Sequence, residues 1–169
     1  MTLHDLNTLP APALHEALRA CCGSPHWVAT LAATRPWDSH SDVLRAAEAG
    51  WQGLSPAELA RAVAHHPRLG ESRAAAAVTA RARAWSADEQ AGTPLADQAT
   101  RAALAQGNLD YEARFGHTFI LCASGRSAAD MLVALRARMT NDADTELTVT
   151  AHELWLITRL RLQKLLGGA

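Results

Sequence analysis

The sequence predicts an all-α fold, a compact single-domain bundle of about seven to nine helices over residues 1–169. Three observations support this prediction. Apolar residues recur at the spacing of a buried helix face, several segments open with helix-capping patterns, and no stretch alternates for long enough to predict a sheet. A chain of 169 residues with 49% apolar content can bury a hydrophobic core as one domain.

The first part of the chain predicts four helices, each with its own start or stop residue. Pro12 lies near the start of the first helix, and Gly23 fits its end. A capping box, Ser55-Pro56-Ala57-Glu58, opens the fourth, which should stop at His65-His66 because Pro67 disfavours helix in the residue before it. The expected helices cover residues 11–22, 25–35, 41–52 and 55–65.

The second part predicts further helices separated by one extended segment. We expect a helix over 72–84, and a second capping box, Ser86-Ala87-Asp88-Glu89, at the start of the next. That helix should be kinked at Gly92-Thr93-Pro94 and run toward Arg114, with a break at Gly107. Residues 118–122 are apolar and strand-like or extended. Two helices follow, one opened by the capping box Ser127-Ala128-Ala129-Asp130 and one over 145–166.

Charge and hydropathy argue against a nucleic-acid or membrane partner. The net charge is −1, whereas proteins that bind a duplex usually carry a basic excess. Arg68, Arg73, Arg81 and Arg83 cluster, but a solvated helix face explains them more simply. No apolar run approaches the roughly 18 residues of a membrane span, and the start lacks a secretory signal pattern. We therefore expect a cytoplasmic protein.

Residue spacing also argues against a metal or cofactor. Cys21, Cys22 and Cys122 lack the spacing of a disulfide framework or zinc site, and the eight histidines lack ligand spacing. The only lysine, Lys164, lies five residues from the C-terminus. This is a poor position for the desolvated lysine that Schiff-base chemistry requires. We expect no metal and no cofactor.

One histidine, one cluster of polar residues and one arginine are candidates for a functional site. His66 follows a helix end enforced by Pro67 and could transfer protons near pH 7, although it could equally be a histidine that favours the helix dipole. Ser86, Glu89 and Gln90 share a helix face and could hold a polar ligand at a helix N-terminus, or simply form a cap. Arg161 lies in an apolar stripe with Leu154, Ile157 and Leu165, where it could bind an anion or pair with a nearby carboxylate.

Five motifs taken together give the chain a family resemblance. It resembles the 2-oxo-4-hydroxy-4-carboxy-5-ureidoimidazoline (OHCU) decarboxylases, in its bacterial branch, over almost its whole length. The resemblance rests on the order and spacing of these motifs: Leu6-Asn7 with Leu9; His66-Pro67-Arg68-Leu69-Gly70; Ser86-Ala87-Asp88-Glu89-Gln90; Asn108 through Ile120, NLDYEARFGHTFI; and Ile157-Thr158-Arg159-Leu160-Arg161-Leu162. Two positions depart from the family pattern: Arg68, where many relatives have an acidic residue, and His117, where an aromatic residue is common.

The resemblance implies an all-α homodimer that works without a cofactor. It implies His66 as the central acid/base residue, with Glu89 as its catalytic partner. It also implies a substrate pocket in which the backbone of residues 119–123 meets a planar ring. The implied pocket residues are Pro67, Ser86, Glu89, Gln90, Phe119, Ile120, Leu121, Cys122, Ala123 and Arg161.

The activity that the resemblance implies is decarboxylation of OHCU to (S)-allantoin in urate breakdown. The substrate would supply its own electron sink, because the carbon that bears the carboxylate adjoins a C=N bond. Two other classes remain open. The chain could be a helical regulator that uses the arginines between 68 and 83 on nucleic acid, or a non-catalytic helical partner protein with an exposed apolar face.

Overall fold

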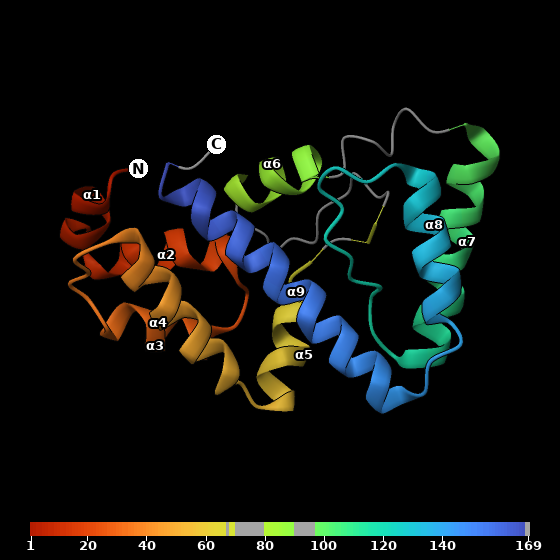
Figure 1. Ribbon diagram of the computed structural model, residues 1–169, viewed down its shortest axis with the longest axis horizontal. Helices are drawn as coiled ribbons and strands as arrows, with labels where there is room; N and C mark the ends of the chain where they lie inside the picture. Colours follow the sequence, from red (N-terminus) through yellow and green to blue (C-terminus); the bar gives the residue numbers. More distant parts are fainter. Residues whose placement is uncertain (67, 70–79, 90–96, 168–169) are drawn as a thin grey trace. The chain divides into compact units, whose positions relative to one another are not determined.

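In a computed structural model of the chain, residues 1–66, 68–69, 80–89 and 97–167 are described, and these residues form nine helices and no strand (Figure 1). The all-α prediction is therefore confirmed. The helices are α1 (Leu3–Thr8), α2 (Ala11–Cys21), α3 (Pro25–Ala33), α4 (His40–Gln52), α5 (Pro56–Ala64), α6 (Ala80–Glu89), α7 (Gln98–Phe115), α8 (Ala128–Arg138) and α9 (Ala143–Leu165). None of the described helices is long and apolar enough to cross a membrane.

The chain divides into two compact units, one of which is discontinuous in sequence. The first contains Met1–Ala62 and Trp155–Ala169, and the second contains Val63–Leu154. The long helix α9 supplies residues to both units. That residues 1–169 form one functional domain stays a prediction.

The first unit is built around α2, α3 and α4, which pack in sequence order. Ser24 caps α3 by accepting a hydrogen bond from the Trp27 backbone N–H at 3.1 Å. The indole of Trp27 is fully buried and donates to the Ala47 carbonyl of α4 at 2.9 Å. A buried indole N–H needs such a partner, so this bond fixes α3 against α4 while the ring fills the core.

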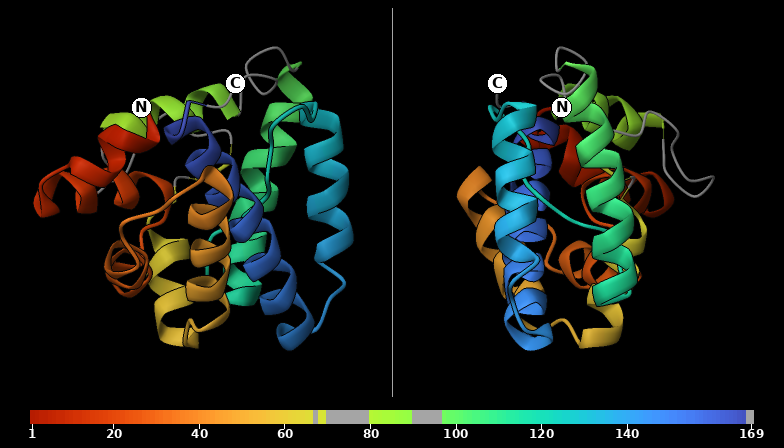
Figure 2. Two further views of the ribbon diagram at one scale, coloured as in Figure 1. Left: turned by 60° about the vertical axis from the view of Figure 1, so that its left-hand side comes forward. Right: turned by 90° about the vertical axis from the view of Figure 1, so that its right-hand side faces the viewer.

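The second unit is organised by α7 and α8, which lie side by side (Figure 1). The two helices run in the same direction, and residues 117–127 return between their ends (Figure 2). An extended residue covers about 3.3 Å and a helical residue about 1.5 Å. A short extended segment can therefore retrace the 18-residue helix α7. The turn into this segment uses Gly116, whose φ of 76° favours glycine.

Two local expectations need correction, and one helix was not expected. Ser86 and Glu89 lie in the last turn of α6, which is continuous over Ala80–Glu89, so they do not cap a helix N-terminus. A capping box and an ordinary helix turn share the same spacing, and no helix breaker precedes Ser86. Helix α7 passes through Gly107 without a break. Glycine fits the close packing there, because an added Cβ would lie 2.8 Å from Leu135 Cδ2 on α8. Helix α1, with its capping box of Thr2 and Asp5, was not expected.

Most predicted helix boundaries agree with the structure, and two segments cannot be compared. The capping box at Ser127 and Asp130 is present in full. At α5, the Ser55 hydroxyl accepts from the Glu58 N–H, while the Glu58 carboxylate accepts from the hydroxyl of Ser24. The helix expected from 72 to 79 and the kink expected at 92–94 lie outside the described residues.

Candidate active site

His66 lies two residues beyond the end of α5, in the second unit. Its backbone N–H donates to the Val63 carbonyl at 2.9 Å, which closes a final turn. The residue is 8% exposed. This confirms the predicted helix end before Pro67, which itself lies outside the described residues. The histidine is therefore held at a buried corner rather than on an open helix surface.

The chain that follows His66 is fastened to α7 by two side chains. Asn108, 2% exposed, donates from Nδ2 to the Leu69 carbonyl at 2.9 Å. The Arg68 guanidinium binds the Glu112 carboxylate through Nε–Oε1 at 2.7 Å and Nη2–Oε2 at 2.6 Å. Hydrogen bonding from Arg68 is the main reason why the pKa of Glu112 lies below its ordinary value. The contacts fix residues 68 and 69 on the helix that carries one of the family-like motifs.

Ser86 and Glu89 are buried on α6, at 7% and 8% exposure. Their spacing of three residues places them on one side of the helix. The Glu89 carboxylate and the Ser86 hydroxyl therefore lie on the same side of α6. Gln90 lies outside the described residues.

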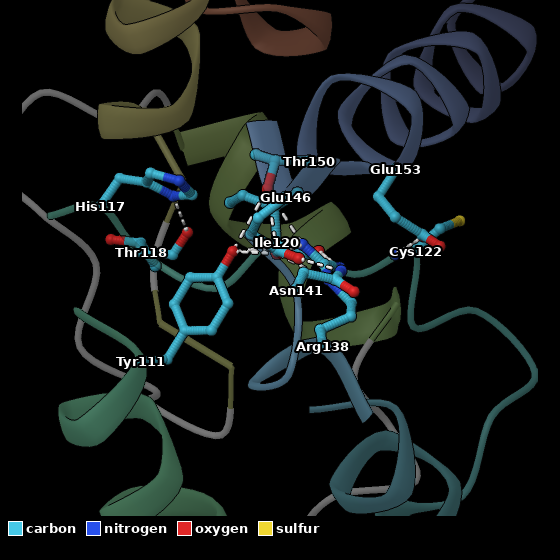
Figure 3. A network of polar contacts seen from close by, with 10 residues as sticks. All are labelled: Tyr111, His117, Thr118, Ile120, Cys122, Arg138, Asn141, Glu146, Thr150 and Glu153. Atoms are coloured by element: carbon cyan, nitrogen blue, oxygen red, sulfur yellow. Dashed lines mark hydrogen bonds and ion pairs between the residues drawn. The ribbon is translucent and has the colours of Figure 1, made fainter. Parts of the chain in front are cut away.

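Residues 119–123 form a buried extended segment between α7 and α8. The exposed fractions of Phe119, Ile120, Leu121 and Ala123 are all 5% or less. The segment has no sheet partner among the described residues, so other groups must satisfy its backbone. The Ile120 carbonyl accepts from Arg138 Nη1 at 2.6 Å, and the Cys122 N–H donates to Glu153 Oε2 at 2.8 Å (Figure 3). The Ala123 carbonyl accepts from the Arg126 N–H at 3.0 Å.

A buried polar network surrounds Arg138 at the end of α8 (Figure 3). Arg138 Nε donates to Glu146 Oε1 at 2.8 Å and Nη2 donates to the Thr150 hydroxyl at 3.0 Å. The Tyr111 hydroxyl also donates to Glu146, and Asn141 Nδ2 donates to Glu146 Oε2 at 2.7 Å. Burial by itself would raise the pKa of Glu146, but these hydrogen bonds outweigh it and hold the pKa below 4.5. Glu146 is therefore a buried carboxylate that stays charged.

The Arg138 network was not predicted, although the sequence held a signal for it. Buried positions Ala128, Met131 and Leu135 recur along α8 at helical spacing, and Arg138 continues the same stripe. An arginine in an apolar stripe indicates a partnered charge. The carboxylate partner could not be predicted, because Glu146 lies on the next helix.

Cys122 brings the extended segment together with two carboxylates. Burial raises the pKa of its thiol, and the nearby negative charges of Glu153 and Glu89 raise the pKa further. Glu89 of α6 therefore lies close to the segment that the resemblance assigns to substrate.

Arg161 belongs to the first unit, whereas the other predicted site residues belong to the second. It is 3% exposed on α9. Its neighbours include the buried thiol of Cys22, whose pKa is raised to about 12, mainly by burial, although the nearby Arg161 charge and the Thr158 hydroxyl lower it. The prediction that the guanidinium is at least partly buried is confirmed, and its function stays a prediction.

The described residues contain no group of three or more histidine, cysteine, aspartate or glutamate side chains that could hold a metal ion. Cys21, Cys22 and Cys122 are free thiols, and the first two are buried.

Comparison with known proteins agrees with the motif pattern. A family model described as OHCU decarboxylase matches residues 7–163. The chain belongs to the OHCU decarboxylase family. This family assignment covers both units, and it covers every residue in the predicted site.

Three curated relatives share parts of the chain. The uric acid degradation bifunctional protein TTL of Arabidopsis thaliana is 29% identical over 87% of this chain and 45% of its own length. The bifunctional protein PucL of Bacillus subtilis (strain 168) is 28% identical over 95% of this chain and 32% of its own length. The OHCU decarboxylase of Amia calva is 32% identical over 60% of this chain and 57% of its own length. The chain thus spans about a third to somewhat over half of the length of these relatives.

Two solved structures share the fold. A crystal structure of OHCU decarboxylase in the presence of (S)-allantoin aligns with a TM-score of 0.76 and 27% identity, covering 90% of this chain and 98% of that chain. A crystal structure of (S)-allantoin synthase aligns with a TM-score of 0.72 over 98% of this chain and 54% of that chain, and at 18% identity it supports the fold alone.

Proposed function

We propose that this protein decarboxylates OHCU to (S)-allantoin without a cofactor. The observation that carries the proposal is the family match over residues 7–163, which contains the candidate residues His66, Glu89 and Arg161. The alignment with nearly the full length of a decarboxylase chain supports it. The one lysine of the chain, Lys164, lies at the end of α9, which supports a mechanism without a lysine-bound intermediate.

The substrate supplies the electron sink in this mechanism. The bond between the ring carbon and the carboxylate breaks and carbon dioxide leaves. The bonding electron pair forms a C=C bond to the adjacent ring carbon, and the electrons of the C=N bond move to its nitrogen, which takes up a proton. The ring hydroxyl gives up its proton to become a carbonyl, and the C=C electron pair takes a proton at the ring carbon that bears the urea group. Addition to one face sets the S configuration.

His66 and Glu89 are the proposed proton-transfer groups. Neutral His66 accepts the proton of the substrate hydroxyl as carbon dioxide leaves, and Glu89 orients the imidazole. A general acid/base in this position contributes about 10²- to 10⁴-fold to the rate. The burial of both residues, 8% exposed each, supports a site with little water, where proton placement is controlled.

The remaining predicted residues are proposed to bind the substrate. Pro67, Ser86 and Gln90 would line the pocket, and the 119–123 backbone would meet the planar ring. Arg161 would stabilise charge that moves onto the ring. It would not simply hold the leaving carboxylate, because binding the ground state does not lower the barrier.

The nucleic-acid alternative has lost one of its supporting residues. Arg68, the first arginine of the basic stretch, binds Glu112 through two hydrogen bonds instead of presenting its charge to a ligand. No contact among the described residues favours a nucleic-acid partner. A homodimer and a cytoplasmic location remain part of the proposal, and light scattering of the purified protein would test the first.

The decisive experiment follows the product. Urate, a urate oxidase and the hydrolase that precedes OHCU decarboxylation generate the unstable substrate in a cuvette, and circular dichroism reports optically active allantoin. We expect the protein to speed the appearance of the (S)-allantoin signal. Spontaneous decay gives racemic product, so an unchanged signal after addition of the protein would refute the proposal.

A further inference from the structure

The backbone of the extended segment is held by charged side chains on one edge. Arg138 binds the Ile120 carbonyl at 2.6 Å, and Glu153 binds the Cys122 N–H at 2.8 Å (Figure 3). In an extended chain, the backbone groups of residues two apart lie along the same edge, and those of the residue between them lie along the opposite edge. The N–H and carbonyl of Leu121 therefore face away from Arg138 and Glu153.

The Leu121 peptide groups are buried and still need partners. Leu121 is 5% exposed. Within the described part of the chain, no hydrogen bond to its backbone N–H or carbonyl is formed. Buried backbone groups are almost always paired in folded proteins. A ligand with one acceptor and one donor side by side would satisfy both groups at once.

A cyclic amide or ureide has this pattern. Its ring N–H and adjacent carbonyl lie on one edge, as do the N–H and carbonyl of a single extended residue. The same edge of the ring could thus donate to the Leu121 carbonyl and accept from the Leu121 N–H. Glu89 lies near enough to Cys122 to raise the pKa of its thiol, so a ring bound here would lie near the proposed acid/base groups.

We propose that Glu153 and Arg138 are positioning residues that turn the Leu121 peptide groups toward the ring amide of the substrate. This inference rests on the proposed decarboxylase function and adds to it the residue that recognises the ring and the side chains that orient it. Glu153 acts through the length of its side chain, as the acceptor for Cys122. Its ion pair with Arg126, at 3.9 Å, is not required for this function.

Two substitutions of Glu153 distinguish the effect of side-chain length from the effect of charge. Glu153→Gln keeps an acceptor at the same distance and removes the charge, whereas Glu153→Asp keeps the charge and withdraws the acceptor by one carbon. We expect Gln to keep kcat/KM within about fivefold of wild type, because a neutral acceptor retains roughly half the strength of a charged one. We expect Asp to lose about 10- to 100-fold, as for a misplaced binding group. Arg126→Gln, the control, should match wild type.

Two further measurements separate substrate-ring binding from turnover and from loss of folding. Calorimetric titration with (S)-allantoin reports ring binding without turnover, and thermal melting reports whether each variant is folded. The inference predicts that Glu153→Asp binds allantoin more weakly than Glu153→Gln does, at comparable melting temperatures. The opposite order, or equal binding and turnover in both variants, would overturn it. Wild-type protein that produces no (S)-allantoin would instead count against the proposed function.

Discussion

Arg68 and Glu112 form a two-point ion pair that joins the chain after His66 to the middle of α7. The guanidinium Nε and Nη2 each donate to a different carboxylate oxygen, at 2.7 and 2.6 Å. The pair therefore gives the Arg68 charge an acidic partner on a helix 44 positions further along the chain.

Exchanging the two charges should preserve the pair. Arg68→Glu alone places two carboxylates together and should lower the free energy of unfolding by about 1 kcal/mol, while the double exchange with Glu112→Arg should recover part of that loss. The side chains are 39% and 23% exposed, so screening keeps the effect small. Urea unfolding of the single and double variants measures the coupling, and strictly additive losses would show that the pair contributes nothing.

Substitution of His66 should affect turnover much more than stability. His66→Asn should lower kcat by about 100-fold or more, because it removes the proposed acid/base group. His65→Asn is the matched control, since His65 is adjacent but is not a proposed site residue. Turnover of the two variants in the circular dichroism assay decides the assignment, which equal losses would contradict.

Arg161 offers a test in which activity and stability should change differently. Arg161→Met keeps the length and apolar packing of the side chain but removes its charge and all five donors. We expect a folded variant with an unchanged or higher melting temperature and a large loss in kcat/KM. Arg161→Lys should rescue poorly, since a point charge does not reproduce the guanidinium fork. A marked loss of melting temperature with normal turnover would instead assign Arg161 a purely structural function.

Acid should weaken the second unit through Glu146. Its folded-state pKa lies below 4.5, because hydrogen bonds outweigh the effect of burial. The resulting stabilisation is present above the unfolded-state pKa and is lost as the pH falls through the folded-state value. Glu146→Gln should therefore be less stable than wild type at pH 7, with a smaller further loss on acidification below about pH 4.5. Thermal melting across pH 3–7 tests this, and parallel pH profiles for both proteins would argue against it.

Adding a methyl group at Gly107 should test the close packing of α7 and α8. Gly107→Ala gains about 1 kcal/mol in helix propensity. However, the new Cβ would lie 2.8 Å from Leu135 Cδ2, and Leu135 is 2% exposed. We expect net destabilisation of about 1 kcal/mol, since overpacking costs about 1–3 kcal/mol. Combining it with Leu135→Val should cost less than the sum of the two single variants in urea unfolding.

Local sequence patterns predicted the helices well where a stop residue was present. Gly23 and Pro67 both mark helix ends close to those observed. The pattern at Ser86 misled, because serine and glutamate three residues apart fit both a helix start and a helix interior. Gly107 misled for a different reason. Its small size serves contact with Leu135, a residue 28 positions later in the sequence.

The candidate site could be predicted only in part. His66 and Glu89 follow from local motifs and the family resemblance, and both are buried. The side chains that hold the extended segment were missed, because Arg138 and Glu153 meet it only after the chain folds.

The division of the chain also has a consequence during protein synthesis. The second unit, Val63–Leu154, is contiguous and can complete its packing once residue 154 has left the ribosome. The first unit begins to emerge earlier, yet its residues from Trp155 onward are synthesised only after Leu154. Trp51, for example, contacts Trp155 with ring centroids 5.6 Å apart, and that contact must wait about 100 residues. Residues 1–62 are therefore made before the second unit, although the unit to which they belong is completed after it.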